Sequence, residues 1–296
     1  MEQRLSILVT GAAGFVGSHV ARLARNSGLS VITHSRYPTQ GIDFSGDLGD
    51  LAALRGLPWD SIGTVIHCAA AIPSRSDAFD RDNTGTAIAL ADVLSGASRL
   101  RRLVHVSSVA VYRPPTSGTW PISEHADVID ATEIQANSYA HSKRRAEVAL
   151  DGVMRRRPDV SVCHLRASSI YGTGMIRTTL LPVLVQRARQ NQPIVLRGPR
   201  AYRQNFVHVM DVASLAVGLA RETSGGFAPV VNAFSDDTYG LFELADLVRI
   251  ELGSSSPTVD ETEDISCPDP VFENKVAKRH HPHFRALRDH LRELPA

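Results

Sequence analysis

Several features that mark particular classes of protein are scarce or missing in this sequence. Only three of the 296 residues are cysteines, and no two of them have the spacing of a disulfide framework or a metal site. We therefore expect a reducing compartment, the cytoplasm, and no bound metal. The net charge of +1 gives no reason to expect a nucleic acid or a membrane surface as a partner.

Long apolar runs are also missing. No stretch approaches the roughly 20 apolar residues that a membrane-spanning helix needs. The first residues, MEQRLSILVTG, lack the apolar core and the cleavage site of a signal peptide, so we expect none. Basic clusters such as Lys143-Arg144-Arg145 are interpreted as solvated helix faces rather than as binding patches.

What the sequence does contain is a regular alternation of short apolar runs and helical segments. The expected strands cover residues 5–9, 30–34, 64–68, 102–106 and 160–165, and the expected helices cover residues 15–26, 79–97 and 138–156. This alternation predicts a parallel sheet with helices on both faces. Strands that are buried on both sides have nearly continuous apolar sequences, as these do. The expected fold class is therefore α/β, with a doubly wound parallel Rossmann sheet.

The alternation ends near Tyr171, after which proline and glycine recur. Further helices are expected over residues 211–222, 241–252 and 284–294, with Asp211 as an N-cap and residues 253–270 as an exposed loop. The sequence thus predicts an NAD(P)-binding Rossmann domain over residues 1–171. A smaller C-terminal α/β lobe over residues 172–296 is expected mainly to bind substrate, with a segment near 204–222 packing back on the Rossmann domain.

A glycine cluster follows the first expected strand and opens the first expected helix. In this context Gly11 allows a sharp turn, Gly14 allows the backbone to approach a pyrophosphate, and Gly17 allows close packing of helix and strand. The N-terminus of the helix then presents N–H groups and a positive dipole end to phosphates. The alternative is a tight turn without a ligand, but the surrounding strand and helix favour a dinucleotide site.

The end of the second expected strand distinguishes between the two nicotinamide cofactors. An acidic residue there would bind the ribose 2′-hydroxyl of NAD, but this chain has Ser35 and Arg36 instead. Arg36 suits the 2′-phosphate of NADP, with Ser35 as a further donor, so we favour NADP(H) over NAD(H). Arg36 as a solvated loop cation remains the alternative. Asp47, followed by Leu48, is placed to contact the adenine or to cap a helix.

Tyr139 and Lys143 lie four residues apart near the start of an expected helix, so both project from one face. An ammonium group near a phenol lowers the pKa of the phenol and prepares it for proton transfer. Ser107 and Ser108 directly follow an expected strand, where active-site groups of open α/β sheets lie. We expect Ser108, rather than Ser107, to hydrogen-bond the substrate oxygen, although capping or turn formation also accounts for these serines.

Motifs along nearly the whole chain resemble those of one family, the extended short-chain dehydrogenases/reductases, also called the NAD-dependent epimerase/dehydratase family. The matching segments are TGAAGFVG from Thr10, GDLGD from Gly46, VIHCAA from Val65, DNTGT with Asn83, HVSSVAVY from His105, YAHSK from Tyr139, LRASSIYGTG from Leu165 and QNFVHVMDVA from Gln204. Members of this family mostly act on sugar nucleotides, so the resemblance implies a nucleotide sugar as the small-molecule substrate.

The resemblance also implies roles for individual residues. Ser108, Tyr139 and Lys143 match the catalytic set. Asn83 matches a residue that helps to shape the active site, and it is expected to contact the substrate. Cofactor contacts are implied for Gly11, Ala13, Gly14, Phe15, Val16, Gly17, Ser35, Arg36, Asp47, Leu48, Ala69, Ala70, Ala71, Tyr139, Lys143 and Ser169. A homodimer is implied through the helices expected over residues 79–97 and 138–156.

Departures from the family pattern narrow the expected reaction. Dehydratases of the family carry an Asp-Glu pair just after the catalytic serine or threonine, where this chain has Val109 and Ala110, which argues against dehydration. An arginine that often binds the substrate diphosphate is replaced by Gln204, and Arg203 or Arg177 would have to compensate.

These observations favour one function over three alternatives. The favoured function is hydride transfer at a hydroxyl or keto carbon of a sugar nucleotide, as a 4-keto sugar-nucleotide reductase that uses NADPH. The first alternative is an NAD-dependent 4-epimerase that regenerates its cofactor in each cycle. A second is a reductase of a non-sugar carbonyl, which the loss of the diphosphate-binding arginine leaves open. The third is a non-catalytic NAD(P)-binding protein, although such proteins typically lose the tyrosine or the lysine.

Overall fold

The computed structural model describes residues 5–72, 78–133, 138–222 and 228–295. The chain divides into two compact units, each built from several segments. Unit 1 comprises Met1–Val111, Asp127–Arg166 and Val212–Val231, and unit 2 comprises Tyr112–Ala126, Ala167–Asp211 and Asn232–Ala296. A single boundary at residue 171 therefore does not separate the two units. That one binds the cofactor and the other mainly the substrate stays a prediction.

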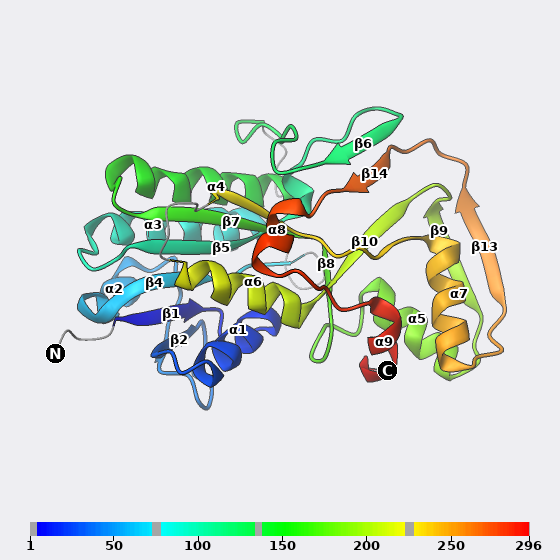
Figure 1. Ribbon diagram of the computed structural model, residues 1–296, viewed down its shortest axis with the longest axis horizontal. Helices are drawn as coiled ribbons and strands as arrows, with labels where there is room; N and C mark the ends of the chain where they lie inside the picture. Colours follow the sequence, from blue (N-terminus) through cyan, green and yellow to red (C-terminus); the bar gives the residue numbers. More distant parts are fainter. Residues whose placement is uncertain (1–4, 73–77, 134–137, 223–227, 296) are drawn as a thin grey trace. The chain divides into compact units, whose positions relative to one another are not determined.

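A seven-stranded sheet forms the centre of unit 1 (Figure 1). Its strands, in spatial order, are β11 (Val230–Ala233), β7 (Ser161–Ala167), β5 (Arg102–Ser108), β4 (Ile62–His67), β1 (Ser6–Thr10), β2 (Val31–Ser35) and β3 (Phe44–Ser45). The pairs β1–β2, β2–β3, β1–β4 and β4–β5 all run parallel. This arrangement confirms the predicted doubly wound α/β fold. The chain begins at β1 and runs outward to β3 before it returns to β4, so the strand order reverses between β1 and β4, where ligands of such sheets bind.

Helices cover both faces of this sheet, as predicted (Figure 1). They are α1 (Phe15–Asn26), the short α2 (Leu51–Arg55), α3 (Thr86–Gly96), α4 (Tyr139–Arg156) and α6 (Val209–Arg221). Figure 1 shows α3 and α4 side by side on one face, and α1 and α6 on the other. A π-helical segment, Asp80–Gly85, precedes α3, so the helix expected over residues 79–97 is formed in two parts.

One hydrophobic core lies between the sheet and the α3–α4 layer. Leu8, Val65 and Leu103 occupy adjacent register positions on β1, β4 and β5 and are completely buried. They belong to one cluster with Leu90 of α3 and Leu150 of α4. Each such leucine contributes about 1.5–3 kcal/mol by leaving water, so this layer holds α4 firmly against β5. The position of α4 matters because it carries Tyr139 and Lys143.

In the part of the chain that the structure describes, unit 2 is built from three small sheets and short helices. The first sheet contains β12 (Thr238–Gly240), β10 (Arg203–His208) and β8 (Ser169–Tyr171), and the others pair β13 (Thr258–Glu263) with β9 (Ile194–Pro199) and β14 (Asp269–Phe272) with β6 (Thr119–Ile122). The helices are α5 (Leu180–Arg189), α7 (Leu241–Leu252), α8 (Lys275–His280) and α9 (Leu287–His290).

Two local expectations for unit 2 are wrong. Residues 253–270 do not form one continuous loop, because β13 pairs in parallel with β9. The sequence of β13, TVDETE, has no continuous apolar run, since a mostly exposed strand needs none. Asp211 is not an N-cap but lies in the first turn of α6, where Nδ1 of His208 accepts the hydrogen bond from the Met210 N–H.

Among the described residues, no helix is both long enough and apolar enough to cross a membrane.

Candidate active site

The loop between β1 and α1 has the shape that a dinucleotide site requires. Gly11 adopts a φ of +67°, and a Cβ on it would lie 2.7 Å from the backbone of Ala69. A Cβ on Gly17 would lie 2.2 Å from the carbonyl oxygen of Gly11. Gly14 precedes α1 and no side chain caps this helix, so N–H groups of its first turn are left to a ligand. These residues therefore fit the pyrophosphate of a nicotinamide dinucleotide.

Small side chains surround this loop. Ala13 is exposed, and Phe15 and Val16 at the start of α1 are half-buried. After β4, Ala69 is half-buried and Ala70 is exposed, so the two positions that follow Cys68 carry only methyl side chains. The carboxyl ends of β1 and β4 thus carry glycine and alanine at the point where the strand order reverses.

Tyr139, Ser108 and Lys143 come together where α4 packs on the end of β5. The Tyr139 hydroxyl and the Ser108 hydroxyl form a hydrogen bond, and the ring of Phe79 packs edge-on against Tyr139 at 5.7 Å between centroids. Nζ of Lys143 donates to the carbonyl oxygen of Val106 at 2.7 Å. Both helix side chains therefore reach neighbouring positions of the same strand. Their catalytic role stays a prediction, but this geometry is the one it requires.

The pKa values of these groups have a common cause, which is burial. Burial raises the pKa of Tyr139, and the hydrogen bond with Ser108 opposes this rise. Burial lowers the pKa of Lys143 from 10.5 to about 8, although the charge of Glu147 acts in the opposite direction. The ammonium of Lys143 is directed at Val106, so the expected lowering of the Tyr139 pKa by this lysine is not seen.

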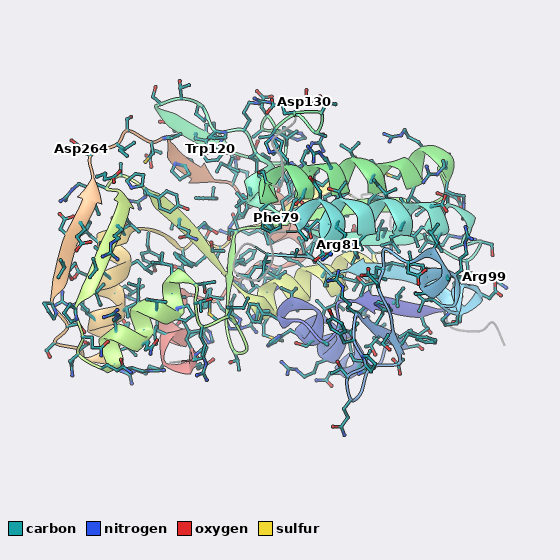
Figure 2. The ribbon with its side chains drawn as sticks, turned by 180° about the vertical axis from the view of Figure 1, so that it is seen from behind. Phe79, Arg81, Arg99, Trp120, Asp130 and Asp264 are labelled. Atoms are coloured by element: carbon teal, nitrogen blue, oxygen red, sulfur yellow. The ribbon has the colours of Figure 1, made fainter. Side chains whose placement is uncertain are left out.

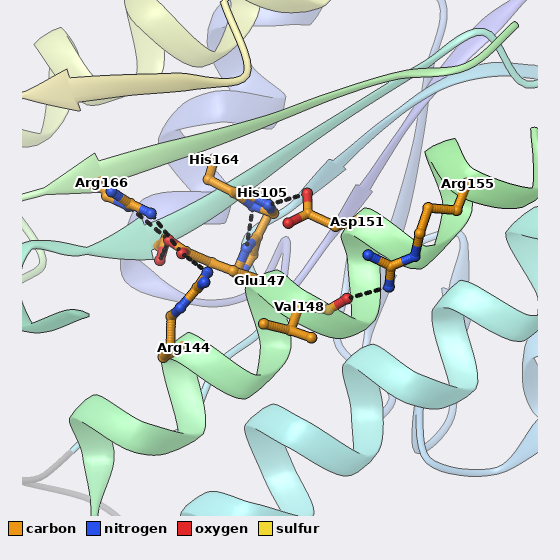
Figure 3. A network of polar contacts seen from close by, with 9 residues as sticks. His105, Arg144, Glu147, Val148, Asp151, Arg155, His164 and Arg166 are labelled. Atoms are coloured by element: carbon orange, nitrogen blue, oxygen red, sulfur yellow. Dashed lines mark hydrogen bonds and ion pairs between the residues drawn. The ribbon is translucent and has the colours of Figure 1, made fainter. Parts of the chain in front are cut away.

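Ser107 and Ser108 have different surroundings. The Ser107 hydroxyl donates to the buried carboxylate of Glu147 at 2.7 Å, so it holds β5 to α4. Glu147 also accepts two hydrogen bonds from Arg166, at 2.9 and 2.8 Å, and one from Arg144 at 3.1 Å (Figure 3). Burial by itself would raise the pKa of Glu147, but the hydrogen bonds and charge of Arg166, with Ser107, lower it to about 2. Of the two serines, Ser108 is the one that faces Tyr139.

Asn83 holds the loop after β4 in place. Its Oδ1 accepts from the Ala71 N–H at 2.7 Å, and its Nδ2 donates to the Ala71 carbonyl at 3.2 Å. Nδ2 also donates to the Ser142 hydroxyl at 3.0 Å, which ties this loop to the first turn of α4. Asn83 therefore positions the groups around Tyr139 from inside the protein. Its contact with substrate stays a prediction.

Arg36 is an exposed residue directly after β2, and its side chain is part of an ion-pair cluster. Its guanidinium donates to both carboxylate oxygens of Asp82, at 3.0 and 3.3 Å, and its Nε lies 3.6 Å from Asp47. Arg81 donates to the same Asp82 carboxylate at 2.8 Å. Figure 2 labels Arg81 and Phe79 at the segment before α3. Two guanidinium groups thus flank one buried carboxylate.

Asp47 and its neighbours have other roles than helix capping. Asp47 accepts from the Gly49 N–H at 2.8 Å within a turn, while Asp50 is the residue that caps α2, through the Ala52 N–H. Ser35 donates to the Tyr37 carbonyl at 2.5 Å, and Leu48 is buried. Contact of these residues with a cofactor stays a prediction.

The remaining candidate residues belong to unit 2. Ser169 of β8 accepts a hydrogen bond from Gln204 of β10, and Arg203 forms an ion pair with Glu243 at 3.2 Å. Arg177 is exposed. The proposed contacts of Ser169 with cofactor and of both arginines with substrate stay predictions.

Unit 2 also contains a group with metal-ligand chemistry, formed by His208, His290 and Glu293, whose ligand atoms lie within 4.8 Å of one another. Nδ1 of His208 accepts from the Met210 N–H at 3.2 Å, which places the proton of the neutral ring on Nε2. A protonated Nε2 has no lone pair to offer a metal ion. The hydrogen bond to Met210 therefore disfavours a metal at this position.

Several residues near Lys143 were not identified from the sequence. Glu147 and Asp151 continue the four-residue spacing of Tyr139 and Lys143, so all four share one face of α4. This four-residue spacing is the sequence signal that could have identified Glu147 and Asp151. His105 and His164 lie inside the apolar strands β5 and β7, where the sequence pattern indicates core residues. In the structure both lie close to this face of α4.

Comparison with known proteins gives a consistent result. A model of the NAD dependent epimerase/dehydratase family matches residues 7–233. A dTDP-4-dehydro-6-deoxy-D-allose reductase of Streptomyces bikiniensis is 26% identical over 274 residues, covering 84% of this chain and 81% of the relative. A D-erythronate dehydrogenase of Cupriavidus necator is 29% identical over 254 residues, covering 73% of this chain and 75% of the relative.

Solved structures share the fold. The UDP-glucose 4-epimerase of Thermotoga maritima with UDP-glucose superimposes with a TM-score of 0.81 at 18% identity, covering 98% of this chain and 97% of that one. The dTDP-glucose 4,6-dehydratase of Bacillus anthracis with NAD gives a TM-score of 0.80 at 18% identity, covering 98% and 95%.

Proposed function

This chain belongs to the NAD dependent epimerase/dehydratase family, and we propose that it is an NADPH-dependent reductase of a 4-keto sugar nucleotide. The observation that carries the proposal is the hydrogen-bonded pair of Tyr139 and Ser108, with Lys143 buried one helical turn away. A reductase of a keto sugar nucleotide is among the relatives, at 26% identity. The expectation of a nicotinamide-dependent enzyme of this family is thereby confirmed.

The described residues suit proton transfer to a carbonyl oxygen. When the cofactor is bound, it supplies the hydride. The Tyr139 hydroxyl donates a proton to the same carbonyl as it becomes an alcohol, and Ser108 holds that oxygen in place. Because burial raises the pKa of Tyr139, the phenol keeps its proton until the substrate oxygen gains negative charge. We assign to Lys143, buried one helical turn along α4, the return of a proton to Tyr139.

Reduction is favoured over dehydration by the residues that follow Ser108. Val109 and Ala110 form a short helical turn directly after β5 and carry no group that can accept or donate a proton. Loss of water requires an acid or base beside the carbon that loses its substituents. Epimerisation stays the alternative, because it uses the same Tyr139 and Ser108 and differs in keeping the cofactor bound through the cycle.

The preference for NADPH is supported by Arg36. The guanidinium groups of Arg36 and Arg81 flank Asp82, at 3.0 and 2.8 Å, as they would flank a phosphate. The hydrogen bonds with Asp82 raise the pKa of Arg36, so its charge is permanent. A dianionic 2′-phosphate gains more from these guanidinium groups than a ribose hydroxyl does.

A second candidate is reduction of a carbonyl compound that carries no nucleotide. Gln204 stands where the family pattern has an arginine for the substrate diphosphate, and its side chain is bonded to Ser169. A D-erythronate dehydrogenase, whose name contains no nucleotide, is among the relatives at 29% identity.

We also propose that the protein forms a homodimer and that it lies in the cytoplasm. The outer face of α3 and α4 forms a groove of about 550 Å³, with Ile88 56% exposed beside it. An apolar side chain on the face of two packed helices favours burial against a second copy. All three cysteines are free, which fits a reducing compartment.

The substrate experiment separates these candidates. Purified protein is incubated with NADPH and 4-keto-6-deoxy sugar nucleotides, and with UDP-glucose in the absence of added cofactor. NADPH oxidation with formation of the hydroxy sugar nucleotide is expected. Interconversion of UDP-glucose and UDP-galactose without NADPH consumption would establish the epimerase instead. Thermal stabilisation by D-erythronate, but by no nucleotide sugar, would favour the second candidate.

A further inference from the structure

A continuous line of hydrogen bonds leads from Lys143 to the surface of unit 1. Nζ of Lys143 lies 3.2 Å from Nε2 of His105. Nδ1 of His105 lies 3.2 Å from Nδ1 of His164, and Nε2 of His164 lies 2.9 Å from Oδ1 of Asp151. Figure 3 shows the part from His105 through His164 to Asp151. Two histidine side chains thus connect the lysine one turn after Tyr139 with a carboxylate two turns further along α4.

The direction of every hydrogen bond in this line is fixed by chemistry. A lysine ammonium only donates, so Nε2 of His105 accepts, and the proton of the neutral ring is on Nδ1. This N–H donates to Nδ1 of His164, whose own proton is therefore on Nε2. That N–H donates to the Asp151 carboxylate. All donors point outward from Lys143 to Asp151.

Burial separates the two ends of the line. Lys143, His105 and His164 are each at most 3% exposed, whereas the side chain of Asp151 is 33% exposed. Leucine or valine would fill the two strand positions without the cost of burying polar rings. Burial, followed by the charge of Lys143, holds the pKa of His105 well below its usual range. His105 is therefore neutral, and the lone pair on its Nε2 faces the ammonium of Lys143.

Other charged or titratable groups surround His105 without interrupting the line. The groups that face it are Lys143, Glu147 and Asp151 of α4, His67 of β4, and His164 and Arg166 of β7. Burial lowers the pKa of His67 to about 3, and Nδ1 of His67 is bonded to Thr10 at 2.7 Å. Glu147 is bonded to Arg166 and Ser107. His67, Glu147 and Arg166, which are not part of the line, stay in one protonation state while it transfers a proton.

We propose that His105, His164 and Asp151 form a proton path between Lys143 and solvent. The proposal rests on the proposed function, because it serves the proton that carbonyl reduction takes from Tyr139 and Lys143. It provides a route through the interior of unit 1, from the buried Lys143 to the partly exposed Asp151.

Each transfer along the path is balanced. In the outward direction an N–H bond of Lys143 breaks and a bond forms at Nε2 of His105. The Nδ1–H bond of His105 then breaks as one forms at Nδ1 of His164, and the Nε2–H bond of His164 breaks as an O–H bond forms on Asp151. Lys143 and Asp151 both become neutral. The inward transfer, which reduction needs, is the reverse and starts from the opposite tautomers, with the proton of His105 on Nε2 and that of His164 on Nδ1. Both rings therefore exchange tautomers first, and Lys143 then receives a proton that Asp151 takes from water. Since one transfer exchanges the tautomers of both rings, a second in the same direction requires the imidazoles to turn first.

Two variants remove proton transfer while keeping hydrogen bonds. Asp151→Asn still accepts from His164 but cannot take a proton, and His164→Gln still accepts and donates but cannot exchange tautomers. We expect each to lower kcat for NADPH-dependent reduction roughly tenfold, less than the 10²–10⁴-fold of a direct acid or base, since water in the pocket provides a slower route. We also expect a changed pH profile and a changed solvent deuterium isotope effect on kcat. Asp151→Glu should restore all three, and Asp60→Asn, at an exposed position outside the path, should change none.

Nitrogen NMR of histidine-labelled protein tests the path without activity. We expect the proton of His105 on Nδ1 and that of His164 on Nε2, with both signals changing together as Lys143 titrates. In His164→Gln the path to solvent is interrupted. The proton on His105 should then no longer exchange with solvent along it. Normal kcat, pH profile and isotope effect in both variants, or His105 protonated on Nε2 beside a charged Lys143, would overturn the path. If the wild type reduces no carbonyl but the NMR result holds, the proposed function fails and the path stands.

Discussion

Arg166 on β7 binds both carboxylate oxygens of Glu147 on α4, at 2.9 and 2.8 Å, in the interior of unit 1. The side chains are 5% and 0% exposed, so this pair is buried on both sides. Glu147 also receives the Ser107 hydroxyl, which directs Ser107 away from Tyr139 and leaves Ser108 to face it. The position of Ser108 thus depends on an ion pair one helical turn beyond Lys143.

Removal of one partner from this pair should be costly. Arg166→Met would leave the Glu147 carboxylate buried with fewer donors, and breaking such a pair costs about 3–5 kcal/mol. We expect urea unfolding to show a loss of this size. The exposed pair of Arg197 and Glu261 provides the control, since Arg197→Met should cost at most about 1 kcal/mol. Equal losses in the two variants would contradict the account.

The same pair predicts how stability depends on acid. The pKa of Glu147 is lowered from 4.5 to about 2 in the folded protein, against the rise that burial alone would cause. Because the folded-state pKa is depressed, its contribution is fully present above the unfolded value near 4.5. It is lost as pH falls from there towards 2. Unfolding measured between these limits should show a weaker pH dependence in Glu147→Gln than in the wild type.

Lys143 predicts a second pH dependence, this time of activity. Burial lowers its pKa from 10.5 to about 8, so it is charged below that value and neutral above it. Reduction requires a proton from the Tyr139–Lys143 pair, so kcat/KM for reduction should fall as pH rises through about 8. Lys143→Met should show low activity without this fall. A kcat/KM that rises across the same range would contradict the role of Lys143 as proton source.

Arg36 should determine the preference between cofactors. Arg36→Ala removes charge-assisted hydrogen bonds to a 2′-phosphate, each contributing about 1.5–3 kcal/mol, so the Kd for NADPH should rise roughly ten- to hundredfold. The Kd for NADH should stay nearly constant. Calorimetric titration of both cofactors checks this, with Arg99→Ala, an exposed arginine labelled in Figure 2, as control. An equal rise in the Kd for NADPH and for NADH would show that Arg36 does not bind the 2′-phosphate.

Gly17 should be intolerant of any side chain. A Cβ there would meet the Gly11 carbonyl oxygen at 2.2 Å, so Gly17→Ala must displace the backbone of the loop. We expect a loss of about 1–3 kcal/mol in stability together with loss of dinucleotide binding. Gly218→Ala in α6 is the matched control, because a Cβ there meets nothing within 4 Å and should stabilise the helix by about 0.5–1 kcal/mol. Dinucleotide binding by Gly17→Ala at wild-type affinity would exclude the loop as the site.

The helices and strands were predictable where their signals are local. The helices Phe15–Asn26 and Leu241–Leu252 begin and end at the expected residues, since each is bounded by glycine or a break in apolar spacing. The strand β13 was missed because its mostly exposed sequence, TVDETE, is paired only through its backbone. Backbone pairing leaves no trace in the pattern of apolar residues.

The candidate site, too, was predictable only where its residues lie close together in the sequence. The spacing of Tyr139 and Lys143 predicted a shared helix face, which the structure has. The ion pair of Arg36 with Asp82 joins residues 46 positions apart, and no local sequence pattern predicts it. His105 and His164 are 59 positions apart and meet only because β5 and β7 are neighbours in the sheet. Contacts of this kind follow from strand order, which sequence spacing alone does not give.

The most direct test of the proposed function is rapid mixing of NADPH-bound protein with a 4-keto-6-deoxy sugar nucleotide. The account predicts a burst of NADPH oxidation in the wild type, its reduction by about 10²–10⁴-fold in Tyr139→Phe, and no change in Tyr202→Phe, an exposed tyrosine of unit 2. Undiminished hydride transfer in Tyr139→Phe would contradict the assignment of Tyr139, and with it the active site described for this protein.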